Sequence, residues 1–364
     1  MKKLIALLFL FGLTALVCAH VSAESSGGSL KPAELKEFSD LRAIVLRQNG
    51  TSLESMDLRE CFQTLLTATF DTRTVWPPKS RMPEKFNPAE IIEMGRDPGL
   101  GIRRLQIAGV TGRGVRVAII DQPLLRDHEE YAGKVKKYTA VDCEDVMPQM
   151  HGAAVASLLV GERCGTAPGA DLYYWAEPSW KRDYAYRTEA LKQIIAFNRN
   201  RPIGERIRVV SVSIGYNNDF KNLDMWKEAL VEAKKSGLIV IHCGQDISGA
   251  GCPLYRDVND PGSYRICYYA ASSKREIPPN YLYLPIDNRT SAGFEGKKDY
   301  VFWSRGGLSW GPPYLAGVIA LALQKRPELS EDLIFELLRE TGDPLNKGRL
   351  IDPGSFLEKA WKMK

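Results

Sequence analysis

Histidine is scarce in this chain of 364 residues: there are four, at positions 20, 128, 151 and 242. Chemistry that needs an imidazole base therefore has few candidates. Metal binding is also limited. His242 and Cys243 stand near Cys252, but a fourth ligand and the spacing typical of zinc sites are missing, so we predict no metal site.

Dense tracts of Lys and Arg with interleaved aromatic residues are absent, and the net charge is only +5. Nucleic acid is therefore excluded as an expected partner. The chain also lacks internal repeats. Its 44% hydrophobic and 26% charged residues are ordinary for a globular protein.

A long apolar run is also missing, because the longest, at residues 4–17, is shorter than the roughly 20 residues that span a bilayer. Lys2 and Lys3 precede this run, and the small residues of the segment 21–23 (VSA) follow it. We predict a signal peptide over residues 1–23, export to the extracellular space or periplasm, and no membrane span after cleavage. An uncleaved anchor is the second interpretation.

Six cysteines follow Cys18, at positions 61, 143, 164, 243, 252 and 267. An even number in an exported protein permits disulfides, although the connectivity cannot be deduced. The pairs closest in sequence, Cys143 with Cys164 and Cys243 with Cys252, are the ones we expect; buried free thiols are the alternative.

Residues 24–96 differ from the rest of the chain. Short amphipathic helices are predicted over residues 35–47 and 53–69, and then prolines at positions 77, 78 and 83 break the pattern. We interpret this part as an N-terminal extension or a pro-segment, either removed or packed as an arm on a main domain over residues 97–364.

From residue 97 onwards, strand and helix patterns alternate. Strands are predicted over residues 115–120, 171–175, 207–214, 238–242 and 266–271, and helices over 187–198, 223–235 and 333–339. This order predicts an α/β fold with a mostly parallel sheet covered by helices on both faces. Such sheets carry their chemistry at the carboxyl ends of the strands.

One stretch near the end of the main domain, residues 306–317 (GGLSWGPPYLAG), places a serine at the start of a helix. Prolines suit the first helical turn, where an N–H has no partner. Ser309 is then either a helix cap, which is the commoner use of such a residue, or a nucleophile beside free backbone N–H groups. A base and an orienting acid decide between the two.

Both groups are present in the sequence. His151 begins a helix with apolar residues at the fourth, seventh and eighth positions after it, and the positive end of the helix dipole favours the neutral ring that a general base needs. Asp121 directly follows the apolar strand 115–120. With Ser309, these residues have the composition of an acid–base–nucleophile triad.

These segments resemble those of the subtilisin-like serine proteases, the subtilases. In chain order, they are residues 117–121 (VAIID), 128–131 (HEEY), 151–156 (HGAAVA), 165–170 (GTAPGA), 210–215 (VSVSIG) and 307–317 (GLSWGPPYLAG). The third and the last resemble the family's HGTHVA and GTSMAxPHVAG. The likeness runs from about residue 97 to 342 and implies the family's three-layer architecture.

The resemblance implies a serine endopeptidase acting on polypeptides. Ser309 would attack the peptide carbonyl, His151 would transfer the proton, and Asp121 would orient the histidine. The segment of Ser213, Ile214 and Gly215 would pair with the extended backbone of the substrate. No cofactor is needed for such catalysis; the family often uses structural calcium, but the sequence offers no convincing ligand loop. We expect a monomer.

The sequence departs from the family at several positions. Gln245 stands where the family has its oxyanion asparagine, and offers the same amide donor on one more methylene. Gln122 and Pro123 follow the aspartate, and Ala154 replaces a second histidine. The alternative function is therefore an impaired pseudoprotease that binds peptides or regulates another protease. An esterase ranks last, because the chain order Asp121, His151, Ser309 differs from the Ser, Asp/Glu, His order of that fold.

Overall fold

The computed structural model describes residues 35–267 and 280–363. A parallel sheet of five strands in the order β3-β4-β2-β5-β6 lies at the centre of the main domain. Its strands are β2 (Arg116–Asp121), β3 (Val135–Ala140), β4 (Asp171–Ala176), β5 (Ile207–Val212) and β6 (Ile239–His242). The predicted α/β class is therefore confirmed.

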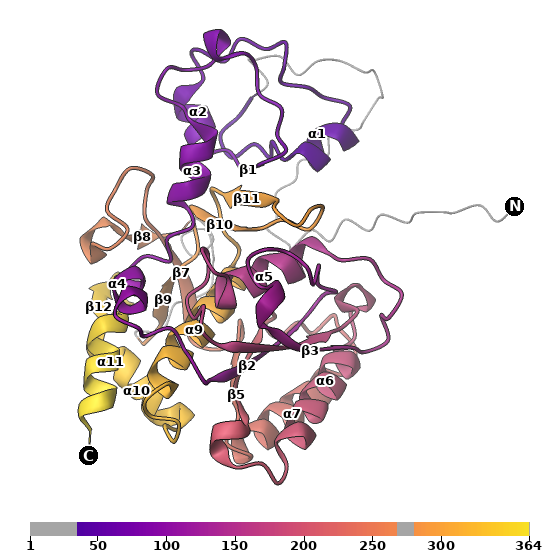
Figure 1. The fold of residues 1–364 in the computed structure, drawn as a ribbon, viewed down its shortest axis with the longest axis vertical. Helices are drawn as coiled ribbons and strands as arrows, with labels where there is room; N and C mark the ends of the chain where they lie inside the picture. The colour runs from indigo at the N-terminus through magenta and orange to yellow at the C-terminus, as the bar shows by residue number, and fades with distance from the viewer. Residues whose placement is uncertain (1–34, 268–279, 364) are drawn as a thin grey trace, which may run out of the picture.

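Two layers of helices cover this sheet (Figure 1). One layer holds α5 (Met150–Val160) and α9 (Gly311–Leu323), and the other holds α6 (Tyr184–Asn198) and α7 (Leu223–Lys235). Side chains of β2 alternate between them: Val117 and Ile119 join the core with α5 and α9, while Ala118 and Ile120 join the core with α6 and α7. An apolar strand without polar alternation is what burial on both faces requires.

A second sheet and the C-terminal helices extend the first core. The sheet has the order β12-β13-β9-β7-β8, with β7 (Ile247–Gly251), β8 (Arg265–Ile266), β9 (Leu282–Pro285), β12 (Asp343–Leu345) and β13 (Gly348–Leu350). The helices are α4 (Ile102–Ile107), α10 (Glu331–Thr341) and α11 (Pro353–Lys362). Apolar residues of α10 and α11 pack in the same cluster as α9.

The N-terminal segment, residues 35–96, packs on a hairpin of the main domain. It contains α1 (Ala43–Gln48), α2 (Phe62–Leu66), α3 (Pro88–Met94) and the strand β1 (Phe70–Asp71). β1 pairs antiparallel with β11 (Tyr300–Trp303), which pairs with β10 (Arg289–Ala292). Phe70 and Phe302 lie side by side in one apolar cluster, so the segment and the hairpin share a core.

The structure corrects several local predictions. The helix predicted over residues 35–47 begins only at Ala43, and the one predicted over 53–69 is reduced to Phe62–Leu66, because turns at residues 37–38, 54–55 and 59–60 interrupt the helical spacing. The strand predicted over 266–271 is described only up to residue 267, and the predicted signal peptide lies outside the described residues.

The predicted disulfides are also wrong. Cys143, Cys164, Cys243 and Cys252 are free thiols. Cys143 lies in the core that contains α5 and α9, whereas Cys164 lies in the core shared with the N-terminal segment. Closeness in sequence therefore did not bring these two together.

Candidate active site

Asp121 is the last residue of β2, at the carboxyl edge of the parallel sheet. Its side chain is 6% exposed, and Oδ1 accepts the N–H of Gln122 at 2.8 Å. Strand β2 is the middle strand of the sheet; it pairs with β5 as far as Ile119 and with β4 as far as Asp121, which lies opposite Ala176.

His151 is the second residue of α5, which begins beside the end of β2. The next residue, Gly152, permits this approach: a Cβ there would lie 2.5 Å from the carbonyl oxygen of Gln122 and 2.7 Å from the hydroxyl of Tyr174. Nδ1 of His151 contacts Oδ1 of Asp121 at 2.7 Å. The acid and the base predicted from sequence are therefore hydrogen-bonded partners.

The electrostatics of His151 differ from the prediction based on the helix dipole. Burial of the ring lowers its pKa, but the charge of Asp121, the hydrogen bond to Asp121 and the charge of Glu177 outweigh it, so the pKa lies above its ordinary value. The dipole argument omitted these two carboxylates. Nε2 is buried and has no hydrogen-bond partner among the described residues, so the ring presents one free nitrogen.

Ser309 lies in a 3₁₀ turn, Leu308–Trp310, that leads directly into α9. Pro312 and Pro313 are in the first turn of the helix, as predicted. Ser309 is 3% exposed, and its carbonyl oxygen accepts the hydroxyl of Ser213 at 2.7 Å. This bond joins the proposed substrate-binding segment to the segment of the serine.

The serine segment also lies against the histidine. The ring of Trp310, the residue after Ser309, packs on the ring of His151 with centroids 5.5 Å apart. The turn containing Ser309 is thus next to the Asp121–His151 pair, and the structure gathers all three predicted residues in one region of the molecule.

Asp287 fixes the start of this loop and was not predicted. Its Oδ1 accepts the N–H of Gly306 at 2.7 Å, three residues before Ser309. Burial raises the pKa of Asp287 to about 7, although the Gly306 N–H and the charge of Arg305 act against that rise. Asp287 follows a short strand that the sequence pattern did not identify, and its partner is nineteen residues away.

Hydrogen bonds from neighbouring residues fix the backbone of the proposed substrate-binding segment. Cys243 donates its N–H to the carbonyl oxygen of Ile214 at 2.9 Å. The hydroxyl of Tyr184 donates to the carbonyl oxygen of Gly215 at 2.7 Å and accepts the N–H of Asn217 at 2.8 Å. These bonds fix the backbone that follows β5.

Gln245, the oxyanion candidate, binds its own strand. Nε2 donates to the carbonyl oxygen of Val240 at 3.1 Å, and Oε1 accepts the N–H of His242 at 3.1 Å. A primary amide nitrogen carries two N–H groups, so one remains after the bond to Val240. An oxyanion role would use that second N–H.

A second buried acid, Glu177, lies next to the pair and was also missed. It follows β4 directly and forms an ion pair with Arg187 of α6, with 2.5 Å between Oε1 and Nη2. A search for acids at strand ends, the criterion that identified Asp121, would have found it.

Comparisons with known proteins bear on the fold. No family model matches the chain. The chain is 24% identical over 272 residues to the subtilisin-like protease PopC of Myxococcus xanthus, a match that covers 65% of this chain and 57% of that protein.

Three solved structures have the same architecture. The subtilase cytotoxin SubAB matches with a TM-score of 0.58 at 14% identity, covering 73% of this chain and 95% of that one. The prenylagaramide maturation protease PagA matches with a TM-score of 0.54 at 17% identity, covering 71% of this chain and 98% of that one. The A-subunit of the AB5 toxin from E. coli matches with a TM-score of 0.54 at 14% identity, covering 73% of this chain and 98% of that one. The fold is subtilisin-like. In such a fold the three predicted residues stand on the central strand, α5 and the turn before α9.

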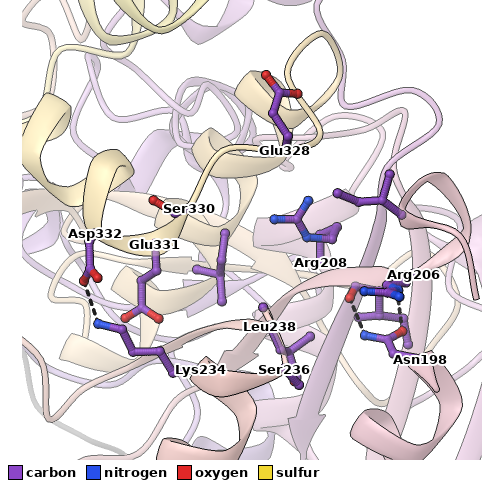
Figure 2. Close-up of a pocket in the computed structure, with 14 residues that line it drawn as sticks. Asn198, Arg206, Arg208, Lys234, Ser236, Leu238, Glu328, Ser330, Glu331 and Asp332 are labelled. Carbon is purple, nitrogen blue, oxygen red and sulfur yellow. Dashed lines mark hydrogen bonds and ion pairs between the residues drawn. The ribbon is translucent and has the colours of Figure 1, made fainter. Parts of the chain in front are cut away.

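A separate pocket of about 310 Å³ lies at the opposite edge of the subtilisin-like sheet (Figure 2). Ile207 and Ile239, the first residues of β5 and β6, line it with Arg208 and Glu331. Strand starts and strand ends lie at opposite edges of a parallel sheet, so this pocket is not part of the site around Asp121.

Metal-binding clusters and membrane-spanning helices are both absent from the described residues. Across residues 35–267 and 280–363, no group of three or more His, Cys, Asp or Glu side chains is arranged to hold a metal ion. Within the same ranges, no helix has the length and apolar character needed to cross a membrane.

Proposed function

We propose that this chain is a serine endopeptidase that hydrolyses polypeptides through Asp121, His151 and Ser309. The observation that carries the proposal is the 2.7 Å contact between His151 and Asp121 beside the turn that holds Ser309. The subtilisin-like fold and the similarity to a subtilisin-like protease support it.

In this proposal Ser309 Oγ attacks the peptide carbonyl and His151 Nε2 takes its proton. Asp121 accepts the Nδ1–H of the ring, which fixes the tautomer with Nε2 free, and stabilises the imidazolium. The proton then goes to the leaving amine, and water hydrolyses the acyl-enzyme by the same route. The N–H of Ser309 and the second N–H of Gln245 are the candidate donors to the oxyanion.

The substrate backbone would lie along Ser213, Ile214 and Gly215. The hydrogen bond from Ser213 to the carbonyl oxygen of Ser309 holds this segment beside the serine turn, and Tyr184 fixes the backbone of Gly215. This arrangement supports an extended peptide passing over Ser309.

The experiment is labelling with an organophosphonate together with hydrolysis of an unfolded protein substrate. We expect the wild type to be labelled at Ser309 and to turn over, and a folded Ser309→Ala variant to do neither. A folded wild type that binds peptides as Ser309→Ala does, with no turnover or labelling in either, would instead support the pseudoprotease.

We also propose that the protein is exported after cleavage at Ala23. Lys2, Lys3 and the apolar run before the cleavage site motivate this. N-terminal sequencing of the protein from the cell exterior or periplasm is expected to begin at Glu24. Recovery of the chain from the membrane fraction with residues 1–23 intact would contradict it.

A further inference from the structure

Glu177 and Arg187 form a buried ion pair beside the proposed triad. The two residues are 2% and 1% exposed, and Oε1 lies 2.5 Å from Nη2. The pair joins the end of β4 to α6. Removing two charges from water costs several kcal/mol for each, so such a pair calls for an explanation.

The backbone places Glu177 next to Asp121. Strands β4 and β2 pair in parallel register, with Ala176 opposite Asp121. The next residue, Glu177, donates its N–H to the carbonyl oxygen of Asp121 at 2.8 Å. Glu177 therefore adds a second buried acid beside the strand end that carries Asp121.

Stability does not account for the pair. Nε and Nη1 of Arg187 and Oε2 of Glu177 are buried without hydrogen-bond partners among the described residues. A buried ion pair with incomplete hydrogen bonding is often no more stable than a well-packed apolar pair of the same volume. Its location beside Asp121 points to an electrostatic role instead.

The mutual effects of these charges agree with that location. Burial raises the pKa of Glu177, the adjacent Arg187 opposes this, and the charge of Asp121 adds to the rise. The charge of Glu177 is in turn among those that raise the pKa of His151. Both effects are what two carboxylates and an imidazole in close range produce.

Three other titratable groups lie within electrostatic range. They are Tyr174, Cys143 and Cys243. Burial raises the pKa of Tyr174 well above its ordinary value, that of Cys143 to about 11 and that of Cys243 to about 12. All three are neutral where a histidine titrates, so they do not change the charge around His151.

We propose that Glu177 is a positioning residue for catalysis, which acts through Asp121 and His151 by adding a second negative charge that favours the imidazolium. The proposal rests on the proposed function. As the proton moves from Ser309 Oγ to His151 Nε2, both carboxylates stay ionised, and the proton leaves on the amine. Arg187 favours the ionised form of Glu177 against the effect of burial on its pKa.

The test uses the double variant Glu177→Leu/Arg187→Met, which removes both charges and keeps the core filled. Glu177→Gln alone would leave Arg187 buried without its partner and is expected to destabilise the fold. The matched control is Glu358→Leu/Lys362→Met, because that ion pair lies at the surface with side chains 65% and 74% exposed.

We expect the double variant to fold with a thermal midpoint close to that of the wild type. Its kcat should fall by up to about tenfold, which corresponds to about 1.4 kcal/mol in the barrier, with little change in KM. The acid limb of the kcat/KM profile should move to lower pH, because His151 loses a charge that favours its protonated form. The control should match the wild type in kcat and in the acid limb of the kcat/KM profile.

A second readout does not need activity: NMR titration of the histidine rings, with the His151 signal assigned from a His151→Gln variant. The His151 pKa is expected to be lower in the double variant than in the wild type. An unchanged His151 pKa, or an effect confined to KM, overturns the role of Glu177. If the pKa of His151 is lower in the double variant but Ser309 of the wild type is not labelled, the proposed function is overturned instead.

Discussion

At the scale of single residues, Asp287 couples protonation to the loop that holds the serine. Its carboxyl accepts the Gly306 N–H, and burial raises its pKa from 3.8 to about 7. The folded protein therefore retains a proton that the unfolded chain releases between these two values. Stability from this group is fully present below about pH 4 and is lost as the pH rises towards 7.

The variant Asp287→Asn tests this linkage. Asparagine keeps an oxygen to accept the Gly306 N–H but does not titrate. We expect the variant to gain stability relative to the wild type as the pH rises from 4 to 8, by up to about 4 kcal/mol for a shift of roughly three pKa units. Denaturant unfolding at several pH values measures it.

The control for Asp287 is Asp224→Asn, because the side chain of Asp224 is 90% exposed. It should follow the wild type at every pH. If Asp287→Asn also runs parallel to the wild type from pH 4 to 8, the carboxyl of Asp287 is not protonated in the folded protein.

Gln245 has two proposed roles that one substitution separates. Gln245→Ala removes the bonds to Val240 and His242, and we expect a loss of about 2 kcal/mol in the free energy of unfolding. Loss of an oxyanion donor lowers kcat by about 100- to 1000-fold with KM nearly unchanged, and we expect this as well. Unfolding curves and steady-state kinetics measure the two effects.

Gln245→Glu is the matched comparison, because it keeps the acceptor for the His242 N–H and removes both amide donors. It should recover part of the stability and none of kcat. If a folded Gln245→Ala enzyme has a kcat within tenfold of the wild type, the side chain is not an oxyanion donor and only binds its own strand.

The residues that the sequence identified share one property. Asp121, His151 and Ser309 each stand at the end or start of an element whose apolar pattern is local and strong. Glu177 and Asp287 also follow strands, but their importance depends on partners brought close by folding, Arg187 and Gly306. Pairing of that kind leaves no periodic signal, so reasoning from single segments missed it.

At the scale of elements, the placement of α5 depends on one glycine. A Cβ on Gly152 would lie 2.5 Å from the Gln122 carbonyl oxygen, closer than atoms tolerate. Gly152→Ala therefore should push the start of α5 away from β2. Misplacement of His151 by about 1 Å is expected to lower kcat/KM by roughly 100-fold, and the strain should cost about 1–3 kcal/mol.

Gly133→Ala is the control for this prediction, because a Cβ on Gly133 meets no atom within 4 Å. Its kcat/KM and thermal midpoint should equal those of the wild type. Normal activity of Gly152→Ala would mean that α5 can shift without moving the histidine relative to Asp121.

Buried elements were predicted better than short ones. The strands of the central sheet have continuous apolar runs because both faces are covered, and the predicted starts and ends of β2, β4 and β6 differ from the structure by at most one residue. β10 and β11 have four residues each, and they are strands because they pair with each other and β11 pairs with β1. Tertiary contacts rather than local pattern form such strands.

At the scale of the whole molecule, residues 35–96 share a core with the main domain. Phe70, Phe302 and Tyr300 are each at most 2% exposed within it, and Arg42 lies over the ring of Trp303 at 4.7 Å. Trp303 in turn contacts Trp310, whose ring packs on His151. The N-terminal segment thus connects through two tryptophans to the candidate site.

We therefore expect the active protein to retain residues 35–96 rather than lose them as a pro-segment. Mass spectrometry of active material should give an N-terminus ahead of residue 35. Deleting residues 35–96 should expose Phe302 and Tyr300, with loss of cooperative unfolding or aggregation as the result. Activity that appears only after proteolytic removal of the segment would contradict this.

A point variant gives the same test without truncation. Phe70→Ala should lower the free energy of unfolding by about 3–5 kcal/mol, as for other buried phenylalanines. Val75→Ala, at a position 57% exposed, should have little effect.

The pairing of β1 with β11 also sets an order of events in folding. Phe70 opposes Phe302, which lies 232 positions further along the chain. Contacts of such separation form late, because the entropy of closing the intervening chain must first be offset by other contacts. The ribosome must synthesise the chain from Phe70 to Phe302 before β1 can pair with β11, which leaves Phe70 open to chaperones during that part of synthesis.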